Sequence, residues 1–173
     1  GRSSVAQIPP LVDFKEVIKL ETKIEKVTIN PELLQSHNNF LHAIGRRESS
    51  NRYDITNRFG YMGKYQFGRK TLNSIGFKHI DNKTFLNSPK LQEAAMLSLL
   101  KSNKKILRRQ IKRYVGTVVN GVYITESGLL AGAHLAGAGN VKKWLRNGKR
   151  FKDGLGTSIV SYIELFGGYK LNI

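Results

Sequence analysis

The sequence predicts a predominantly helical α+β domain that carries one small β-hairpin and follows a short extension. The chain has 173 residues, which suits one domain with a hydrophobic core and an appendage. Apolar residues between Leu91 and Tyr114 recur at helical spacing, whereas residues 118–123 read VVNGVY, with Asn-Gly between β-prone residues. We expect an extension or a linker to a partner over residues 1–30 and the folded domain over residues 31–173.

Charge is the strongest signal in the composition. Lys and Arg number 29 against 12 Asp and Glu, a formal net charge of +17 at pH 7. This excess predicts attraction to a polyanion: nucleic acid, an anionic membrane surface or a bacterial cell wall. The chain has no cysteine, so disulfides and thiolate metal sites are excluded. No apolar run in the sequence is long enough to predict a transmembrane helix.

The first residues, GRSSVAQIPP, contain no initiating Met and no apolar region of a signal peptide. We therefore expect a processed or trimmed form.

The domain is predicted to begin with a helix that leads into a loop rich in glycine. Asn30 and Pro31 form a helix start, an N-cap followed by proline at the first helical position. The helix is expected to end near Glu48 and to turn inward Leu33, Leu34, Leu41 and Ile44. A loop with room for a short hairpin should follow, because glycine recurs at Gly60, Gly63 and Gly68.

Two more helices are predicted in the middle of the chain. A short one covers Arg69–Gly76, and Ser88-Pro89 starts a long one that runs to Tyr114. The face of this long helix opposite its apolar residues is basic, and it consists of Lys101, Lys104, Lys105, Arg108, Arg109, Lys112 and Arg113. Such a face is either a solvated surface or a docking surface for an anionic polymer.

After the hairpin at 118–123, three helices complete the domain. Thr125 is expected to cap a helix that ends at Ala136, whose small residues permit close helix packing. Gly137 and Gly139 should break it before a further turn over residues 141–146. The last helix is expected over Thr157–Phe166.

The stretch from Phe40 to Phe67 holds the main candidate for catalysis. Glu48 lies at a helix end, next to a glycine-rich turn that carries the amide of Gln66, which suggests a general acid with a hydrogen-bonding partner. A plain helix terminus with a surface loop is the alternative. Asp54 lies six positions beyond Glu48 and is either a second carboxylate of a glycosidase or a loop residue that caps local backbone.

Metal chemistry is not expected. The four histidines are His37, His42, His79 and His134. They show no ligand spacing with carboxylates or with each other, except that His37 and His42 are five positions apart. The sequence also lacks a phosphate-binding glycine loop.

Three signatures resemble those of lysozyme-like lytic transglycosylases, in the order of that family and across roughly residues 40–165. Glu48-Ser49 is similar to its Glu-Ser signature, and Gly63-Lys64-Tyr65-Gln66 to its Gly-x-x-Gln signature. The segment GYMGKYQF also resembles resuscitation-promoting factors of the same lysozyme-like group. AHLAGAGNVKKWL, from Ala133 to Leu145, is similar to the family segment Ala-Tyr-Asn-Ala-Gly-x-Gly-Asn-Val. The resemblance implies a lysozyme-like fold and cleavage of peptidoglycan.

Carried onto this chain, the resemblance implies that Glu48 is both acid and base and that Ser49 and Gln66 orient it or the sugar. His134 stands where the family has Tyr, and Leu135 where it has Asn. We expect His134 to replace that Tyr as a polar contact in the cleft, although a histidine among small residues is also common in a core.

Three tyrosines are further candidates for contact with the substrate. Tyr162 resembles the Tyr of a Tyr-Val pair near the end of many such domains, and Tyr61 and Tyr65 could stack on sugar faces. Packing in the core or the loop is the alternative for each of them.

The predicted function is cleavage of the β-1,4 bond between N-acetylmuramic acid and N-acetylglucosamine. In the family the substrate's own N-acetyl group replaces a second carboxylate, and the product carries a 1,6-anhydro-muramic end. A hydrolytic muramidase of the same fold is the nearest alternative, and a non-catalytic basic protein that binds cell wall or nucleic acid is another.

We expect no cofactor. We also expect no nucleic-acid partner, because no aromatic residue interrupts the basic stretch 101–113. The expected partners are peptidoglycan strands and, through that stretch, anionic wall polymers. The expected location is the bacterial envelope, periplasmic or exported, with a phage virion or an injection device as other settings.

Overall fold

The computed structural model describes residue 15 and residues 30–148, 151 and 154–173. The chain divides into the units Gly1–Pro31 and Glu32–Ile173, and the second unit contains the fold described below except for Pro31, the first residue of α2. The predicted extension over residues 1–30 lies outside the described residues except at 15 and 30, so its role stays a prediction.

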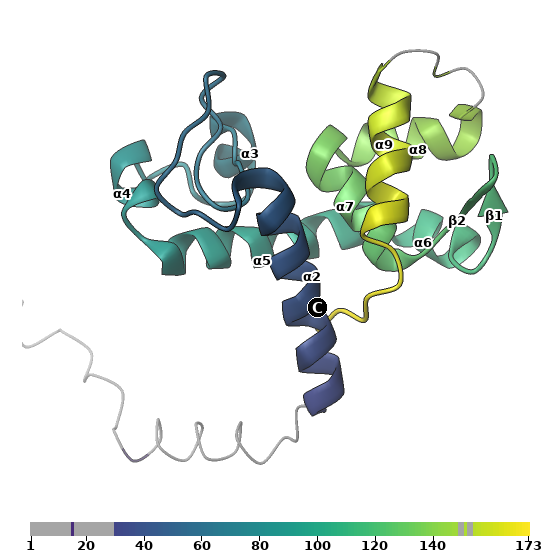
Figure 1. The fold of residues 1–173 in the computed structure, drawn as a ribbon, viewed down its shortest axis with the longest axis horizontal. Helices are drawn as coiled ribbons and strands as arrows, with labels where there is room; N and C mark the ends of the chain where they lie inside the picture. The colour runs from purple at the N-terminus through teal and green to yellow at the C-terminus, as the bar shows by residue number, and fades with distance from the viewer. Residues whose placement is uncertain (1–14, 16–29, 149–150, 152–153) are drawn as a thin grey trace, which may run out of the picture. The chain divides into compact units, whose positions relative to one another are not determined.

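The described part of the chain is largely helical and includes one two-stranded antiparallel sheet (Figure 1). This confirms the predicted α+β fold and its hairpin, in which Val118 pairs with Tyr123 and Val119 with Val122. No helix in this part is long and apolar enough to cross a membrane. The elements are, in order, α2 Pro31–Ser49, α3 Arg69–Ser74, α4 Asn82–Leu86, α5 Pro89–Ile106, α6 Arg108–Tyr114, β1 Val118–Val119, β2 Val122–Tyr123, α7 Glu126–Ala136, α8 Ala138–Asn147 and α9 Gly154–Leu165.

Helix α2 begins at Pro31, as predicted, and buries the face that carries Phe40 and Ile44. Leu34, predicted to point inward, is 39% exposed. The first turns of α2 bury a different residue, His37, because its ring nitrogen Nδ1 accepts a hydrogen bond of 3.1 Å from the backbone N–H of Asn172.

The C-terminal segment after α9 runs back to α2 (Figure 1). The backbone N–H of Lys170 donates to the Ser36 hydroxyl at 2.8 Å, and the rings of Tyr169 and Phe40 meet edge to face with centroids 5.7 Å apart. These contacts fix α2, and with it Glu48 in its last turn.

The predicted helix over 91–114 is two helices, because the chain leaves the helical conformation at Leu107. Leu107 is buried, whereas Ile106, predicted to point inward, is 48% exposed. The prediction of one long helix beneath the basic residues 101–113 is therefore wrong, although all of these cations except Lys104 are exposed. Lys104 also differs from the other basic residues of this stretch, because it forms an ion pair with Glu126 at 3.0 Å and donates a hydrogen bond to the Ile173 carbonyl.

Helix α7 packs against α9, α8 and α5. Thr125 caps it as predicted, because its hydroxyl accepts from the N–H of Gly128 at 3.1 Å. A Cβ atom at Gly128 would lie 2.5 Å from the carbonyl oxygen of Ile163 on α9, so glycine permits this close approach. Gly139 was predicted to break the chain, but it lies inside α8, and the break is at Gly137 (φ +84°).

The loop between α2 and α3 has two isolated antiparallel bridges, Thr56 with Met62 and Met62 with Phe67, in place of a regular hairpin. Helix α4 was not predicted. Its signal is Asp81, whose carboxylate accepts from the N–H of Thr84 at 2.7 Å as an N-cap.

Candidate active site

Glu48 lies in the last turn of α2, and its partly buried side chain lines a hollow of about 280 Å³. The remaining lining residues come from the loop after α2 and from α7, and they are Asn57, Tyr61, Gln66, His134 and Leu135. Three of the residues predicted to contact substrate, Tyr61, Gln66 and His134, thus surround the predicted acid, although they lie up to 86 positions from it in the sequence.

Tyr162 reaches the carboxyl group of Glu48 from α9. Its hydroxyl donates a short hydrogen bond to Oε1 of Glu48. The side chain is 6% exposed. Burial, and then the hydrogen bond and negative charge of Glu48, raise the pKa of Tyr162, so the phenol stays protonated and remains a donor. This contact orients the carboxyl group toward one fixed geometry.

His134 lies on α7 between the two sides of the hollow. Its Nε2 is 2.8 Å from the carbonyl oxygen of Tyr65, and because a carbonyl only accepts, Nε2 carries the proton. Burial lowers the pKa of His134, although the charge of Glu48 and the Tyr65 carbonyl oppose that shift. The ring is therefore neutral at pH 7, and its Nδ1 presents a lone pair that has no protein partner among the described residues.

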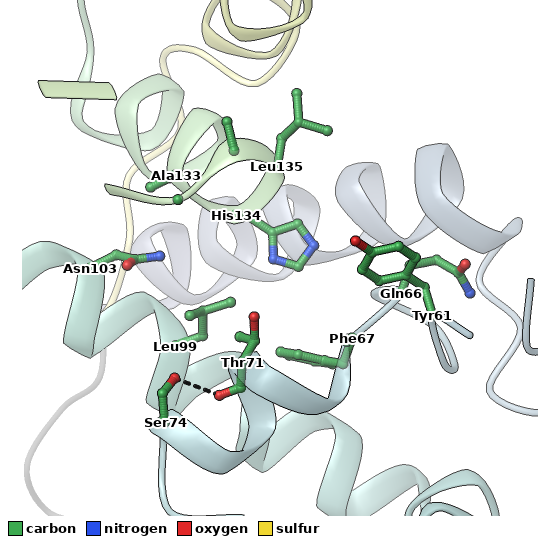
Figure 2. A pocket seen from close by; sticks show the side chains of 13 residues that line it. Tyr61, Gln66, Phe67, Thr71, Ser74, Leu99, Asn103, Ala133, His134 and Leu135 are labelled. Carbon is green, nitrogen blue, oxygen red and sulfur yellow. Dashed lines mark hydrogen bonds between the residues drawn. The ribbon is translucent and has the colours of Figure 1, made fainter. Parts of the chain in front are cut away.

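Gln66 and Tyr61 form the opposite side of the hollow. Gln66 has a positive φ of 56°, and its side-chain N–H donates to the Gly63 carbonyl at 3.0 Å. Tyr61 is 46% exposed, and its hydroxyl points toward the His134 ring (Figure 2). Both side chains are thus placed to meet a ligand.

Asn57 is a lining residue that sequence reasoning missed. Its side-chain oxygen accepts from the backbone N–H groups of Phe59 and Tyr61, both at 2.9 Å, so it shapes the turn that presents Tyr61. The signal was available, because Asn three residues before Gly60 is typical of such a turn.

Ser49 and Tyr65 lie behind the hollow and do not line it. The buried Ser49 hydroxyl is 2.7 Å from the Lys64 carbonyl and accepts from the Arg52 N–H at 3.1 Å, so it joins the end of α2 to the glycine-rich turn. The Tyr65 ring is fully buried, which excludes the predicted stacking on a sugar face.

A polar cluster around Glu93 of α5 holds the glycine-rich turn in place. Its carboxylate accepts from the hydroxyls of Tyr65 (2.5 Å) and Tyr53 (2.6 Å) and from Lys64 Nζ (3.0 Å). Burial would raise the pKa of Glu93, but these three donors lower it on balance. Sequence reasoning missed the cluster, because Glu93 lies 28 to 40 residues from its three donors and belongs to no motif.

Gln92, the neighbour of Glu93, is fully buried and bonds the same turn through its amide. Its oxygen accepts from the N–H of Lys64 at 2.9 Å, and its nitrogen donates to the carbonyls of Tyr53 and Phe85 at 2.9 and 3.1 Å. The turn that carries Gln66 is therefore fixed to α5.

Asp54 is exposed and forms an ion pair with Arg52 at 3.1 Å. The Arg52 hydrogen bond lowers the pKa of Asp54. Asp54 does not line the hollow, and Glu48 is the one carboxylate among the described residues that do. In the described part of the chain, no three His, Asp or Glu side chains gather as a metal site requires.

Comparison with known proteins yields one match. Residues 31–155, well over half of the chain, match the family model of the transglycosylase SLT domain. No curated protein and no solved structure matches.

Proposed function

We propose that this chain, which belongs to the transglycosylase SLT domain family of lysozyme-like lytic transglycosylases, cleaves the β-1,4 bond between N-acetylmuramic acid and N-acetylglucosamine with Glu48 as its one catalytic carboxylate. Glycan cleavage in peptidoglycan follows from the family. The observation that carries the assignment of Glu48 is its place in the hollow, bonded to Tyr162 and without a second carboxylate among the described lining residues.

A single carboxyl group can serve both halves of the reaction. Glu48 gives its proton to the glycosidic oxygen while the bond from that oxygen to C1 breaks, and the oxygen of the substrate's own acetamido group bonds to C1 in its place. The Glu48 carboxylate then takes the proton of the 6-hydroxyl, whose oxygen closes on C1 and displaces the acetamido oxygen. The product is a 1,6-anhydro-muramic end, and Glu48 is again protonated.

The neighbours of Glu48 have supporting roles in this proposal. Tyr162 orients the carboxyl group, and Tyr61 and Gln66 contact the sugar across the hollow. Ser49 acts through the backbone by holding the glycine-rich turn to the end of α2. A substrate in the cell wall supports a place of action in the bacterial envelope, and export, a phage virion or an injection device are the routes we propose for reaching it.

The identity of the product separates transglycosylation from hydrolysis. We expect mass spectrometry of fragments from digested sacculi to show anhydro-muramic ends, with the 18 Da deficit that loss of water gives. Asp54→Asn should digest at nearly the parental rate, because Asp54 is exposed and does not line the hollow. Reducing ends in the parental product, together with a nearly silent Asp54→Asn variant, would assign hydrolysis with two carboxylates.

We also propose that a basic hollow between α6 and α8 holds anionic wall polymer. Arg109 and Arg113 of α6 and Lys142 and Arg146 of α8 line a hollow of about 200 Å³. Among the described residues, none of these four cations forms an ion pair. Converging cations repel one another, so a polyanion bound between them would relieve that repulsion.

Reversing these four charges to Glu should weaken sedimentation with sacculi about tenfold and reduce its dependence on salt. The matched control reverses Lys70, Lys78, Lys90 and Lys101, which are exposed elsewhere and give the same net charge. Equal loss of binding in both variants would show that only net charge matters and would exclude a site between α6 and α8. Turnover of a short soluble glycan should be unchanged in both.

A further inference from the structure

The hairpin of β1 and β2 turns an apolar face outward. Val118 and Tyr123 are directly opposed in the register of the two strands, so their side chains lie on the same face of the sheet. They are 66% and 62% exposed. The other pair, Val119 and Val122, packs against the hydrophobic core. A sheet with one buried face normally carries polar side chains on its other face, so this exposed valine and tyrosine call for an explanation.

The part of the chain around the hairpin is strongly basic. Residues 94–152 contain thirteen Lys and Arg but one carboxylate, Glu126. Among the cations of this stretch that the structure describes, Lys104 alone forms an ion pair, and its partner is the same Glu126. A surface with charges of one sign attracts a surface of the opposite sign.

The basic helices α6 and α8 border the hairpin (Figure 1). Helix α6 ends at Tyr114, four residues before Val118, and the two helices together line the basic hollow described above. The turn of the hairpin contacts the residue that follows α8, because a Cβ atom at Gly148 would lie 2.0 Å from the side-chain nitrogen of Asn120. The exposed apolar pair therefore lies at the edge of a cationic surface.

We propose that the hairpin and the cations around it dock the protein on a membrane surface that contains anionic lipids. Acidic headgroups pair with the Lys and Arg side chains of α6 and α8, and Val118 enters the boundary between headgroups and acyl chains. Tyr123 suits the same boundary, because its ring is apolar and its hydroxyl can stay in contact with water.

A lipid surface explains more of this face than a wall polymer does. A hydrophilic polyanion satisfies the cations but leaves the apolar pair in water, whereas a membrane boundary covers both. The cations can serve either ligand, so the test rests on the apolar pair. Docking goes beyond the proposed reaction and does not depend on it, because neither Val118 nor Tyr123 lines the hollow of Glu48.

The test measures sedimentation of the full chain with vesicles of phosphatidylcholine, with and without about 30% phosphatidylglycerol, at about 0.15 M salt. We expect at least about tenfold tighter binding to the anionic vesicles. The double variant Val118→Thr/Tyr123→Thr should lose about tenfold in that affinity, because it removes both apolar side chains and keeps every charge. Threonine is favoured in strands, so the hairpin should persist.

Leu34→Gln/Leu165→Gln is the matched control. These two leucines are exposed on α2 and α9, and Gln has a similar helix propensity, so this variant should bind like the parental chain. The temperature of unfolding and the turnover of a short soluble glycan should be nearly unchanged in the hairpin variant, because its two side chains are largely exposed and away from the hollow of Glu48.

Tyr123→Trp reports whether the hairpin enters the lipid. The chain has one tryptophan, Trp144, and its side chain is buried, so a change in emission on binding comes from position 123. We expect a shift to shorter wavelength with the anionic vesicles, and quenching by lipids with brominated acyl chains.

Three results would overturn the proposal: no binding to the anionic vesicles, equal binding by the parental chain and the hairpin variant, or binding with no change in the emission of Tyr123→Trp. Self-association of the parental chain that the hairpin variant lacks, without binding to vesicles, would assign the apolar face to a second copy of this chain and also overturn it. Sedimentation velocity over a range of protein concentrations measures this outcome.

Discussion

Replacing Glu48 by Gln should abolish cleavage of peptidoglycan and leave the fold intact. The amide has the shape of the carboxyl group and can still accept from the Tyr162 hydroxyl, but it cannot give up a proton. General acid–base groups contribute about 10²–10⁴-fold, and the loss should reach at least the upper end, because one group serves both steps. The measurement is release of soluble fragments from sacculi, with folding checked by circular dichroism.

Glu164→Gln is the control for this variant. Glu164 is exposed on α9, two residues beyond Tyr162, and undergoes the same chemical change away from the hollow. It should digest at the parental rate. If Glu48→Gln folds correctly and also digests at that rate, Glu48 is not the catalytic acid.

Gly63→Ala should be the most destabilising single change in the glycine-rich turn. Gly63 has a φ of +74°, and a Cβ atom there would lie 2.2 Å from Oε1 of Gln92. Gln92 cannot yield easily, because its amide bonds the Lys64 N–H and the carbonyls of Tyr53 and Phe85. We expect a loss of about 3 kcal/mol in the free energy of unfolding, from the backbone conformation and from broken buried hydrogen bonds together.

Gly60→Ala separates the two causes. Gly60 also has a positive φ, +87°, but a Cβ atom there would have nothing within 4 Å. Only the backbone cost applies, about 1 kcal/mol. Denaturant unfolding of both variants measures the difference, and equal losses would show that the contact with Gln92 does not matter. Activity should fall in the Gly63→Ala variant and not in the Gly60→Ala variant, because the Gln66 amide donates a hydrogen bond to the Gly63 carbonyl.

Local signals in the sequence were reliable where one short stretch decides the structure. Pro31 starts α2, Thr125 caps α7, and Asn120-Gly121 turns the hairpin, because the side chain or the backbone freedom that each element needs lies within it. The prediction of one long basic helix was wrong, because there the distant core decides the structure and the local stretch does not. Nothing within residues 91–114 shows that the core takes Leu107 and leaves Ile106 at the surface.

The candidate site, too, was predictable from the sequence only in part. The resemblance of the signatures marked Glu48, Gln66 and His134 as neighbours, and the structure brings all three to one hollow. It could not place Tyr65, because the position of this ring depends on Glu93 of α5, whose carboxylate accepts from its hydroxyl. A side chain that follows the same motif can face the cleft or the core, and its distant partner decides which.

The sequence by itself determined the family, the helical α+β fold, the strong positive charge and the candidate acid, because these depend on composition, on local pattern and on motifs of adjacent residues. Tertiary structure alone decided which polar groups are paired. It gave Glu48 the hydroxyl of Tyr162, 114 residues away, and it joined His134 to the Tyr65 carbonyl, 69 residues away. Hydrogen bonds act over about 3 Å, so only the packing of α2, α7 and α9 could settle those pairings.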